Sequence, residues 1–290
     1  MEPRVLDRKA KNIEIFKETT SIIKYGSYTA PSGKIIPIDT DTMVQGSECF
    51  HQQLPSVIFP PVQGGTIVMV EMNDCLVAAE RLVKEGYNPA LLNFASAKHP
   101  GGGVEKGTRA QEETICRRST LSRSIYTFDE YYSVQFGYPL KPGNNYPLKS
   151  LDFSVIYSPA VTVFREGLEC TFMEHPFQIG IITNAALNLN GRNSIKLTRD
   201  GNLPENAKNI YRNKIRTIFR IGLLKGHDSL VLGAFGCGAF HNPPLEMAHL
   251  FKEIMEEEEF KNRYKLITFA IITDHNDQNQ NLKCFKEVFN

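Results

Sequence analysis

The sequence predicts an α/β protein with a largely parallel sheet covered by helices on both faces. From residue 65 onward, short β-branched runs alternate with stretches of helical periodicity, a pattern typical of strands joined by crossover helices. The 290 residues are 41% hydrophobic and 22% charged, which is ordinary for a soluble globular protein that buries a core. No internal repeat or linker divides residues 65–290.

The first 64 residues are predicted to form an extension packed on a core of residues 65–290, with the chain remaining one compact unit. Apolar residues spaced among charges up to Lys24 predict a helix. The Gly-, Pro- and Ser-rich segment that follows predicts a hairpin or a long loop.

Within the core, composition and periodicity distinguish strands from helices. The β-branched, apolar runs predict strands at 65–72, 89–96, 153–164, 177–187, 229–236 and 265–274. The amphipathic stretches predict helices at 74–86, 111–126, 204–226, 243–260 and in the last dozen residues. Asp74 is a predicted N-cap and Gly86 a helix stop. Asn242 is predicted to cap the helix that follows it, with Pro243 in the first turn.

Charge and cysteine usage exclude several classes of protein. The net charge of +1 gives no case for nucleic acid or an anionic membrane as partner. No apolar run has the length of a membrane span, and the charged N-terminus does not resemble a secretory signal. The six cysteines are far apart and form no C-x-x-C, which indicates reduced thiols and no zinc site. We therefore expect a cytoplasmic, monomeric protein without a metal or cofactor.

A glycine-rich loop follows the predicted strand 89–96, where ligands bind in open α/β sheets. Three glycines at 101–103 precede the adjacent carboxylates Glu112 and Glu113. Because glycine lacks a Cβ and tolerates positive φ, such a loop can bring the backbone close to a sugar or phosphate. A flexible surface turn is the alternative. The loop is neither a P-loop nor a dinucleotide fingerprint.

A second loop, "GAFGCGAFHNPP" at 233–244, follows the predicted strand 229–236 and opens a helix. Unbonded N–H groups at such a position favour an anion such as a diphosphate. Phe240 could pack on a sugar or belong to the core. Cys237, between two glycines, is interpreted as a small residue rather than a nucleophile, because no histidine lies at a suggestive spacing.

Together, G-G-G, then Q-E-E at 111–113, then G-C-G-A-F at 236–240 resemble the microbial-type poly(ADP-ribose) glycohydrolases. The resemblance implies a macrodomain-like three-layer α/β/α sandwich with a mixed sheet of about six strands and an N-terminal extension. It also implies that ADP-ribose binds in a cleft above the sheet, that Glu113 is the catalytic acid, and that the substrate is an ADP-ribose polymer or an ADP-ribosylated macromolecule.

The same resemblance assigns roles to further residues. Gln111 and Glu112 would orient the distal ribose, Phe240 would hold that ribose, and residues 236–240 would bind the diphosphate. Adenine would lie near the turn after the 65–72 strand. His241 departs from the family, which often has glycine there, and is expected to face solvent. The implied ADP-ribose contacts are Asp74, Cys75, Ser96, Gly101, Gly102, Gly103, Val104, Gln111, Gly236, Cys237, Gly238, Ala239 and Phe240.

Sequence adjacency gives Glu112 and Glu113 unequal parts. Neighbours on a helix diverge by about 100°, so they cannot easily flank one glycosidic bond as an acid and a nucleophile. The simpler assignment is Glu113 as acid/base and Glu112 as its positioning neighbour. A helix start favours an ionised carboxylate, whereas a general acid needs its proton, and the residues leave open which influence prevails. Arg117 and Arg118 are expected to form surface pairs.

Three functions fit these residues. The first is hydrolysis of ADP-ribose polymers, mainly from chain ends, with release of ADP-ribose. The second is hydrolysis of single ADP-ribose units from protein, nucleic acid or a small metabolite. The third is a non-catalytic ADP-ribose reader, which has no need of Glu112 and Glu113.

Overall fold

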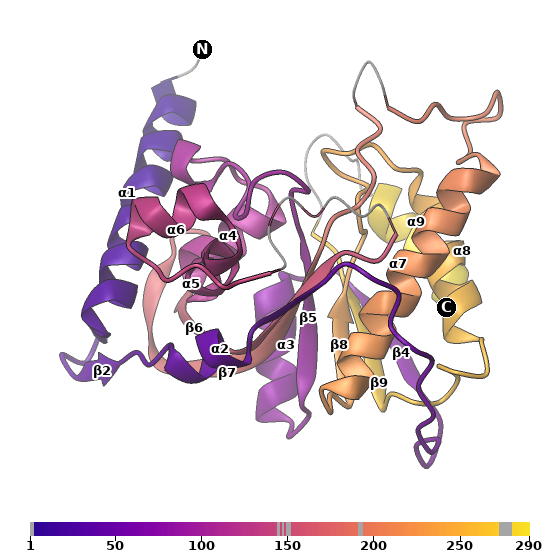
Figure 1. Ribbon diagram of the computed structural model, residues 1–290, viewed down its shortest axis with the longest axis horizontal. Coiled ribbons are helices and arrows are strands. Elements are labelled where there is room, and N and C mark those ends of the chain that lie inside the picture. The colour runs from indigo at the N-terminus through magenta and orange to yellow at the C-terminus, as the bar shows by residue number, and fades with distance from the viewer. Residues whose placement is uncertain (1–2, 144–145, 147, 149–151, 191–193, 273–279) are drawn as a thin grey trace.

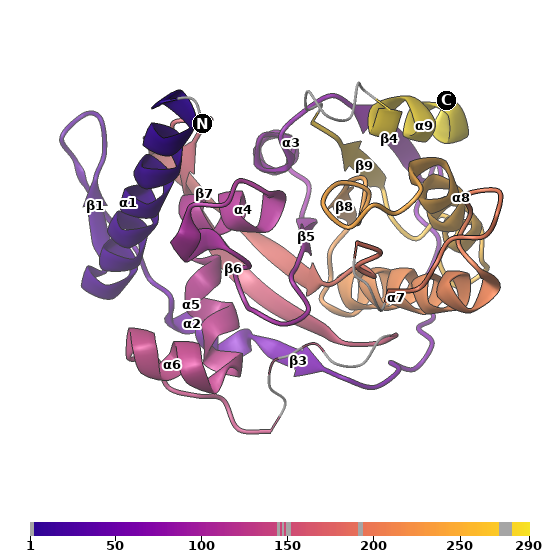
Figure 2. The same ribbon diagram turned by 90° about the horizontal axis from the view of Figure 1, so that it is seen from above.

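A mixed sheet between two layers of helices organises the molecule (Figures 1 and 2). The computed structural model describes residues 3–143, 146, 148, 152–190, 194–272 and 280–290. In the described part the central sheet has seven strands in the order β3-β6-β7-β5-β8-β9-β4. These strands are β3 (Glu48–Phe50), β4 (Ile67–Glu71), β5 (Pro89–Phe94), β6 (Val155–Glu166), β7 (Thr171–Asn184), β8 (Ser229–Leu232) and β9 (Leu266–Ala270).

Two hydrophobic clusters lie on opposite faces of this sheet. One cluster joins the sheet to α7, α8 and α9, and the other joins it to α3, α4 and α5 (Leu121–Ile125). The longer helices are α1 (Pro3–Tyr25), α3 (Cys75–Lys84), α4 (Gln111–Arg118), α7 (Glu205–Leu224), α8 (Pro244–Met255) and α9 (Gln280–Phe289). None of the helices in the described ranges combines the length and apolar character that a membrane span requires. The predicted α/β class and the layered sandwich are therefore confirmed.

The sheet is parallel on one side and antiparallel on the other. Strand β5 runs parallel to β7 and β8, and β9 runs parallel to β8 and β4. Strands β6 and β7 form a long antiparallel hairpin that turns at Gly167, whose φ is +65°. The strand predicted at 153–164 corresponds to nearly all of β6, and the strand predicted at 177–187 corresponds to the second half of β7. The prediction of a mixed sheet is confirmed, and the antiparallel part comes from this hairpin and from β3.

The predicted extension contributes a strand to the sheet. Residues 27–29 and 35–37 form the small hairpin β1–β2 (Ser27–Thr29 and Ile35–Pro37), as predicted. After the short helix α2 (Asp41–Gly46), strand β3 pairs antiparallel with β6. This short edge strand raises the sheet from the expected six strands to seven.

The prediction of a single helix over 111–126 is wrong, because helix α4 ends before Ser119. The Ser119 hydroxyl donates to the Ile115 carbonyl at 2.8 Å and accepts from the Leu121 amide at 3.2 Å. The Thr120 amide donates to the Thr162 carbonyl of β6 at 3.0 Å. Serine and threonine compete in this way with helical hydrogen bonds. After the break come α5 (Leu121–Ile125), η2 (Tyr126–Phe128) and α6 (Glu130–Phe136).

The two predicted caps have different outcomes. Asp74 caps α3 by accepting from the Leu76 and Val77 amides at 2.8 and 3.3 Å, as predicted. Asn242 does not cap α8, which begins at Pro244 with Pro243 as its N-cap residue. The last predicted strand ends at Ala270, and positions 273–274 of that prediction lie outside the described residues.

Candidate active site

Both glycine loops lie at the same edge of the sheet, at the carboxyl ends of two neighbouring parallel strands. Strand β5 pairs with β8 through Leu91 and Val231, and each strand leads directly into its loop (Figure 1). The carboxyl edge of a parallel sheet is where ligands bind in this class of fold. The structure therefore brings the two predicted loops together.

The first loop is built around the protein's own carboxylates. The Gly103 amide donates to Glu113 Oε1 at 2.8 Å, and the Gly101 amide donates to Glu112 Oε1 at 3.1 Å. The Ser96 amide donates to Glu112 Oε2 at 2.7 Å. Glu112 and Glu113 are only 3% and 6% exposed. The flexible surface turn considered from the sequence is therefore excluded.

Steric contacts explain why glycines are needed here. Gly101 and Gly102 have φ of +76° and +58°, which side chains rarely adopt. A Cβ on Gly102 would lie 2.5 Å from Glu113 Oε1 and 3.0 Å from Glu112 Oε2. A Cβ on Gly101 would lie 3.1 Å from the Tyr126 hydroxyl. From the sequence, the space left by the missing Cβ atoms is expected to admit a ligand. In the structure, the carboxyl groups of Glu112 and Glu113 occupy the space beside Gly102.

The two carboxyl groups have different hydrogen-bonding environments. Both oxygens of Glu112 accept main-chain hydrogen bonds from the loop. Glu113 uses Oε1 in this way, while its Oε2 is buried and has no hydrogen-bond partner among the described residues. Glu113 therefore retains one uncommitted oxygen, and Glu112 retains none.

Burial dominates the protonation of Glu112. Desolvation raises the pKa of Glu112 to about 8, and the nearby Glu113 adds to this. The Ser96 and Gly101 amides act in the opposite direction, because they favour the ionised form. For Glu112, burial therefore outweighs the stabilising amides, and the neutral acid prevails at neutral pH.

The raised pKa of Glu112 makes stability depend on pH in a defined direction. Between the ordinary carboxyl pKa of 4.5 and the folded value of about 8, the native state binds a proton that the unfolded state does not. This contribution is complete below pH 4.5 and is lost as the pH rises through 8. Relative to Glu112→Gln, the wild type should therefore lose unfolding free energy from pH 5 to pH 8.

The measurement is urea denaturation of both proteins at several pH values. The constant cost of placing a glutamine amide beside the Ser96 and Gly101 N–H groups cancels when differences between pH values are compared. Parallel pH profiles of the two proteins would contradict the raised pKa.

Gln111 is held by the protein itself. Its Oε1 accepts from the Phe94 amide at 2.7 Å, and its Nε2 donates to the Leu92 carbonyl at 2.9 Å. Nε2 also contacts Cys75 Sγ at 3.6 Å. These contacts tie the start of α4 to the end of β5. The ribose contact expected for Gln111 stays a prediction, and the contacts seen are structural.

Two other predicted ligand residues also have structural contacts. The Val104 side chain is buried in the core and 1% exposed. The Ser96 hydroxyl accepts from the Lys98 and His99 amides at 3.3 and 3.2 Å, which shapes the start of the loop. Any contact of these two residues with a ligand remains a prediction.

The second loop presents main-chain N–H groups. The side chain of Asn242 donates to the Leu187 and Gly236 carbonyls at 2.8 and 2.9 Å and accepts from the Tyr211 hydroxyl at 2.7 Å. It therefore braces the loop instead of capping α8. Within residues 236–240, all of which the structure describes, four amides find no hydrogen-bond acceptor: Gly236, Gly238, Ala239 and Phe240.

The side chains around these amides vary in exposure. Gly238 and Ala239 are exposed, whereas Cys237 and Phe240 are half-buried, and Phe240 packs against the core. His241 is exposed, as expected. A cluster of uncommitted N–H groups in the loop that precedes a helix suits a diphosphate.

Two buried arginines support the site, contrary to the expected surface pairs. Arg117 donates to the Thr108 carbonyl at 2.6 Å and to Thr114 Oγ1 at 3.2 Å. Arg118 pairs with Asp74 Oδ2 at 2.8 Å. They are 3% and 2% exposed. The pair with Asp74 joins the turn predicted for adenine to the end of α4.

Cys75 adjoins the same turn as a neutral thiol. Burial raises its pKa to about 12, with the nearby Asp74 adding to the effect. Each of the six cysteines lies in the described residues, and none of them takes part in a disulfide. Among the residues that the structure describes, no group of His, Cys, Asp and Glu could hold a metal ion.

Asn93 was missed by the sequence interpretation. It is fully buried in β5, and its amide donates to Thr183 Oγ1 at 3.2 Å. It also hydrogen-bonds Glu112, where it opposes the rise in pKa. A lone polar residue within the apolar run "PALLNF" was the signal that could have identified it.

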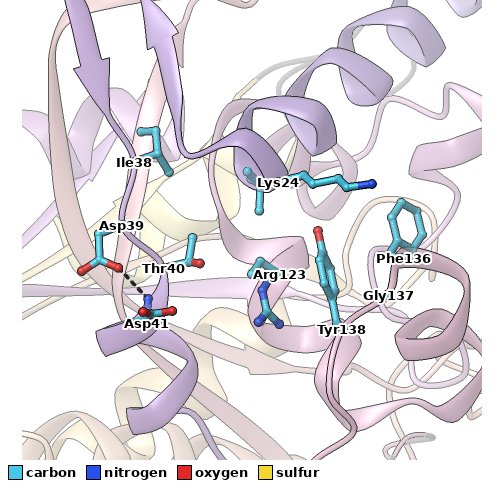
Figure 3. A pocket seen from close by; sticks show the side chains of 10 residues that line it. Lys24, Ile38, Asp39, Thr40, Asp41, Arg123, Phe136, Gly137 and Tyr138 are labelled. Carbon is cyan, nitrogen blue, oxygen red and sulfur yellow. Dashed lines mark hydrogen bonds between the residues drawn. The ribbon is translucent and has the colours of Figure 1, made fainter.

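A surface cavity of about 550 Å³ lies elsewhere, between the N-terminal extension and the segment from α5 to residue 138 (Figure 3). No residue of either glycine loop lines it. Arg123 stacks on the Tyr138 ring at 4.2 Å, and Lys24, Asp39 and Asp41 supply charges of both signs. The candidate active site is therefore defined by hydrogen-bonding geometry and not by this cavity.

Comparisons with known proteins agree with the fold. Residues 16–166 match the family described as microbial-type PARG, catalytic domain. The chain is similar to the poly(ADP-ribose) glycohydrolase of Thermomonospora curvata bound to the inhibitor ADP-HPD. That similarity has 30% identity and a TM-score of 0.76, and it covers 95% of this chain and 98% of that one.

The poly(ADP-ribose) glycohydrolase of Deinococcus radiodurans in complex with ADP-ribose is similar as well. Its identity is 30% and its TM-score 0.66, over 85% of this chain and 95% of that one. No curated protein sequence matches. These similarities define the class of protein as a glycosidase with a macrodomain-like core. The chain belongs to the microbial-type poly(ADP-ribose) glycohydrolases.

Proposed function

We propose that this protein hydrolyses the ribose–ribose O-glycosidic bonds of poly(ADP-ribose), mainly from chain ends, and releases ADP-ribose. The observation that carries the proposal is the arrangement of Glu113. Its carboxyl group is buried at the carboxyl edge of the sheet, one oxygen accepts from Gly103, and the other has no partner among the described residues. A non-catalytic reader has no need of such a group.

In the proposed mechanism Glu113 acts as general acid and then as general base. It gives its proton to the leaving ribose oxygen as the bond breaks through an oxocarbenium-like transition state. The carboxylate that results stabilises the developing cation and then takes a proton from the attacking water. Glu112 is the positioning neighbour, because both of its oxygens are committed to the loop.

The second loop is proposed to bind the diphosphate through its uncommitted amides at 236 and 238–240. Phe240 would pack against the distal ribose, and the turn at Asp74 and Cys75 would adjoin adenine. Asp74 is suited to this place because Arg118 fixes its carboxylate. The arrangement orients the substrate along the carboxyl edge, with its scissile bond at Glu113.

Labelled poly(ADP-ribose) and a panel of mono-ADP-ribosylated proteins, nucleic acids and small conjugates test the proposal. We expect ADP-ribose to be the main early product from polymer, with chains that shorten gradually. Early release of oligomers would contradict cleavage from chain ends. Turnover of the mono-ADP-ribosylated panel without polymer turnover would favour the second function, and binding of ADP-ribose without any turnover would favour the reader.

A further inference from the structure

The N-terminal helix α1 contacts the loop that holds Glu113. Asn12, on α1, is 2% exposed, and its side-chain amide donates to the Gly107 carbonyl at 3.1 Å. Thr19, about two turns further along the same face of this helix, donates to the Arg117 carbonyl at 2.7 Å. Figure 2 shows α1 alongside α4 when the molecule is seen from above. The extension therefore bonds both the loop and the end of the helix that carries the carboxylates.

The turn at Gly107 is shaped to receive α1. Gly107 follows the short helix η1 (Val104–Lys106) and has a φ of +73°. A Cβ at this position would lie 2.9 Å from Lys9 Cγ and 3.2 Å from Ile13 Cγ1. Helix and turn are thus in direct contact at Lys9 and Ile13, and Asn12 of the same helix segment bonds the Gly107 carbonyl.

A short series of hydrogen bonds leads from this turn to the carboxyl group of Glu113. Arg117 donates to the Thr108 carbonyl at 2.6 Å, and the Thr108 amide donates to the Gly103 carbonyl at 3.2 Å. Gly103 in turn donates its amide to Glu113 Oε1 at 2.8 Å. The Gly103 carbonyl also accepts from the Lys106 amide at 2.9 Å. The turn at 107–108 therefore helps to fix the Gly103 peptide, and the Gly103 amide orients Glu113.

We infer that Asn12 is a positioning residue for the glycosidase reaction, acting through Gly107, Thr108 and Gly103 on the carboxyl group of Glu113. The inference rests on the proposed role of Glu113. It assigns the N-terminal helix a part in catalysis, although none of its described side chains is a predicted ligand contact. Loss of the Asn12 amide leaves the Gly107 carbonyl without its side-chain donor and lets the turn shift.

The test compares Asn12→Ala with the wild type in steady-state hydrolysis of polymer and in ADP-ribose binding. Small displacements of a catalytic group are costly, so we expect kcat to fall about tenfold. We expect the Kd for ADP-ribose to stay within about twofold, because the groups proposed to bind the diphosphate lie on the other loop. Gly107→Ala disturbs the same contact from the loop side and should show the same split between kcat and Kd.

Tyr28→Phe is the matched control. The Tyr28 hydroxyl is buried and donates to the Met173 carbonyl at 2.8 Å, so it also anchors the extension to the core by one hydrogen bond. Neither Tyr28 nor Met173 takes part in the hydrogen bonds that lead from Gly107 to Glu113. We expect Tyr28→Phe to lower Tm by an amount similar to Asn12→Ala while it keeps the wild-type kcat.

The outcomes separate this inference from the proposed function. If Glu113→Gln is inactive and Asn12→Ala behaves like Tyr28→Phe, the positioning role is wrong. The same conclusion follows if Asn12→Ala and Gly107→Ala weaken Kd and kcat in equal proportion. If Glu113→Gln is as active as the wild type, the proposed function itself fails.

Discussion

Replacing Glu113 by glutamine is expected to slow hydrolysis of poly(ADP-ribose) by about 10²- to 10⁴-fold, the usual contribution of a general acid/base. Glutamine has nearly the size of glutamate and can still accept from the Gly103 amide, which bonds Glu113 Oε1 at 2.8 Å. It cannot donate a proton to the leaving oxygen. The loss should therefore fall on kcat, with the affinity for ADP-ribose largely retained.

Single-turnover hydrolysis of labelled polymer measures this change, and Glu105→Gln is its matched control. Glu105 lies on η1 in the same loop, and its carboxylate accepts from Gln135 Nε2 at 2.8 Å at the surface. The same chemical substitution is thus made a few residues away, outside the carboxylate pair. Polymer hydrolysis by Glu113→Gln at the rate of Glu105→Gln would show that the catalytic assignment is wrong.

Gly102→Ala is expected to reduce the same activity by about 10²-fold, because misplaced catalytic groups are this costly. The new methyl group would lie 2.5 Å from Glu113 Oε1 and 3.0 Å from Glu112 Oε2, so at least one carboxyl group must move. Adoption of a φ of +58° by alanine also costs about 1–2 kcal/mol of stability. Activity and unfolding free energy should therefore both fall.

Gly33→Ala isolates the backbone part of this effect. Gly33 has a φ of +86°, and a Cβ there would meet nothing within 4 Å. Urea denaturation should show a loss of unfolding free energy for both variants, whereas hydrolysis should fall only for Gly102→Ala. Wild-type activity of Gly102→Ala would contradict the close contact between the loop and the carboxyl groups.

The parts of the fold that were predictable are those with a local pattern. The runs that became β4, β5, β8 and β9 could be identified because β-branched composition and flanking helical periods are visible within a dozen residues. Strand β3 has three residues and exists through pairing with β6, more than a hundred positions away. The break at Ser119 likewise depends on a hydrogen bond between Thr120 and Thr162. Such tertiary contacts leave no periodic signal.

In the candidate site, too, features with a local sequence pattern could be predicted, whereas features that depend on tertiary contacts could not. The glycines at 101–103 and the Glu112–Glu113 pair lie close together in the sequence, so their importance could be predicted. The hydrogen bonds from the loop amides to those same side chains could not. Arg117 and Arg118 were expected at the surface because charged residues are rarely buried without partners. Their partners are a carbonyl at Thr108 and the carboxylate of Asp74, and neither spacing predicts a contact.

Asn242 illustrates a residue with two competing uses. Its place before two prolines is typical of an N-cap, and local rules favour that assignment. The side chain instead bonds Tyr211, Leu187 and Gly236, which are distant in sequence and close in space. Three buried hydrogen bonds outweigh one cap, so tertiary context overrides the local preference.

The commitment of the Gly101, Gly103 and Ser96 amides to the two carboxyl groups has a thermodynamic consequence for substrate recognition. The loop is ordered by hydrogen bonds to side chains of the protein itself. The entropy lost on ordering this segment therefore enters the free energy of folding and not that of association. Binding free energy that would otherwise offset loop ordering remains for distortion of the ribose toward its transition state.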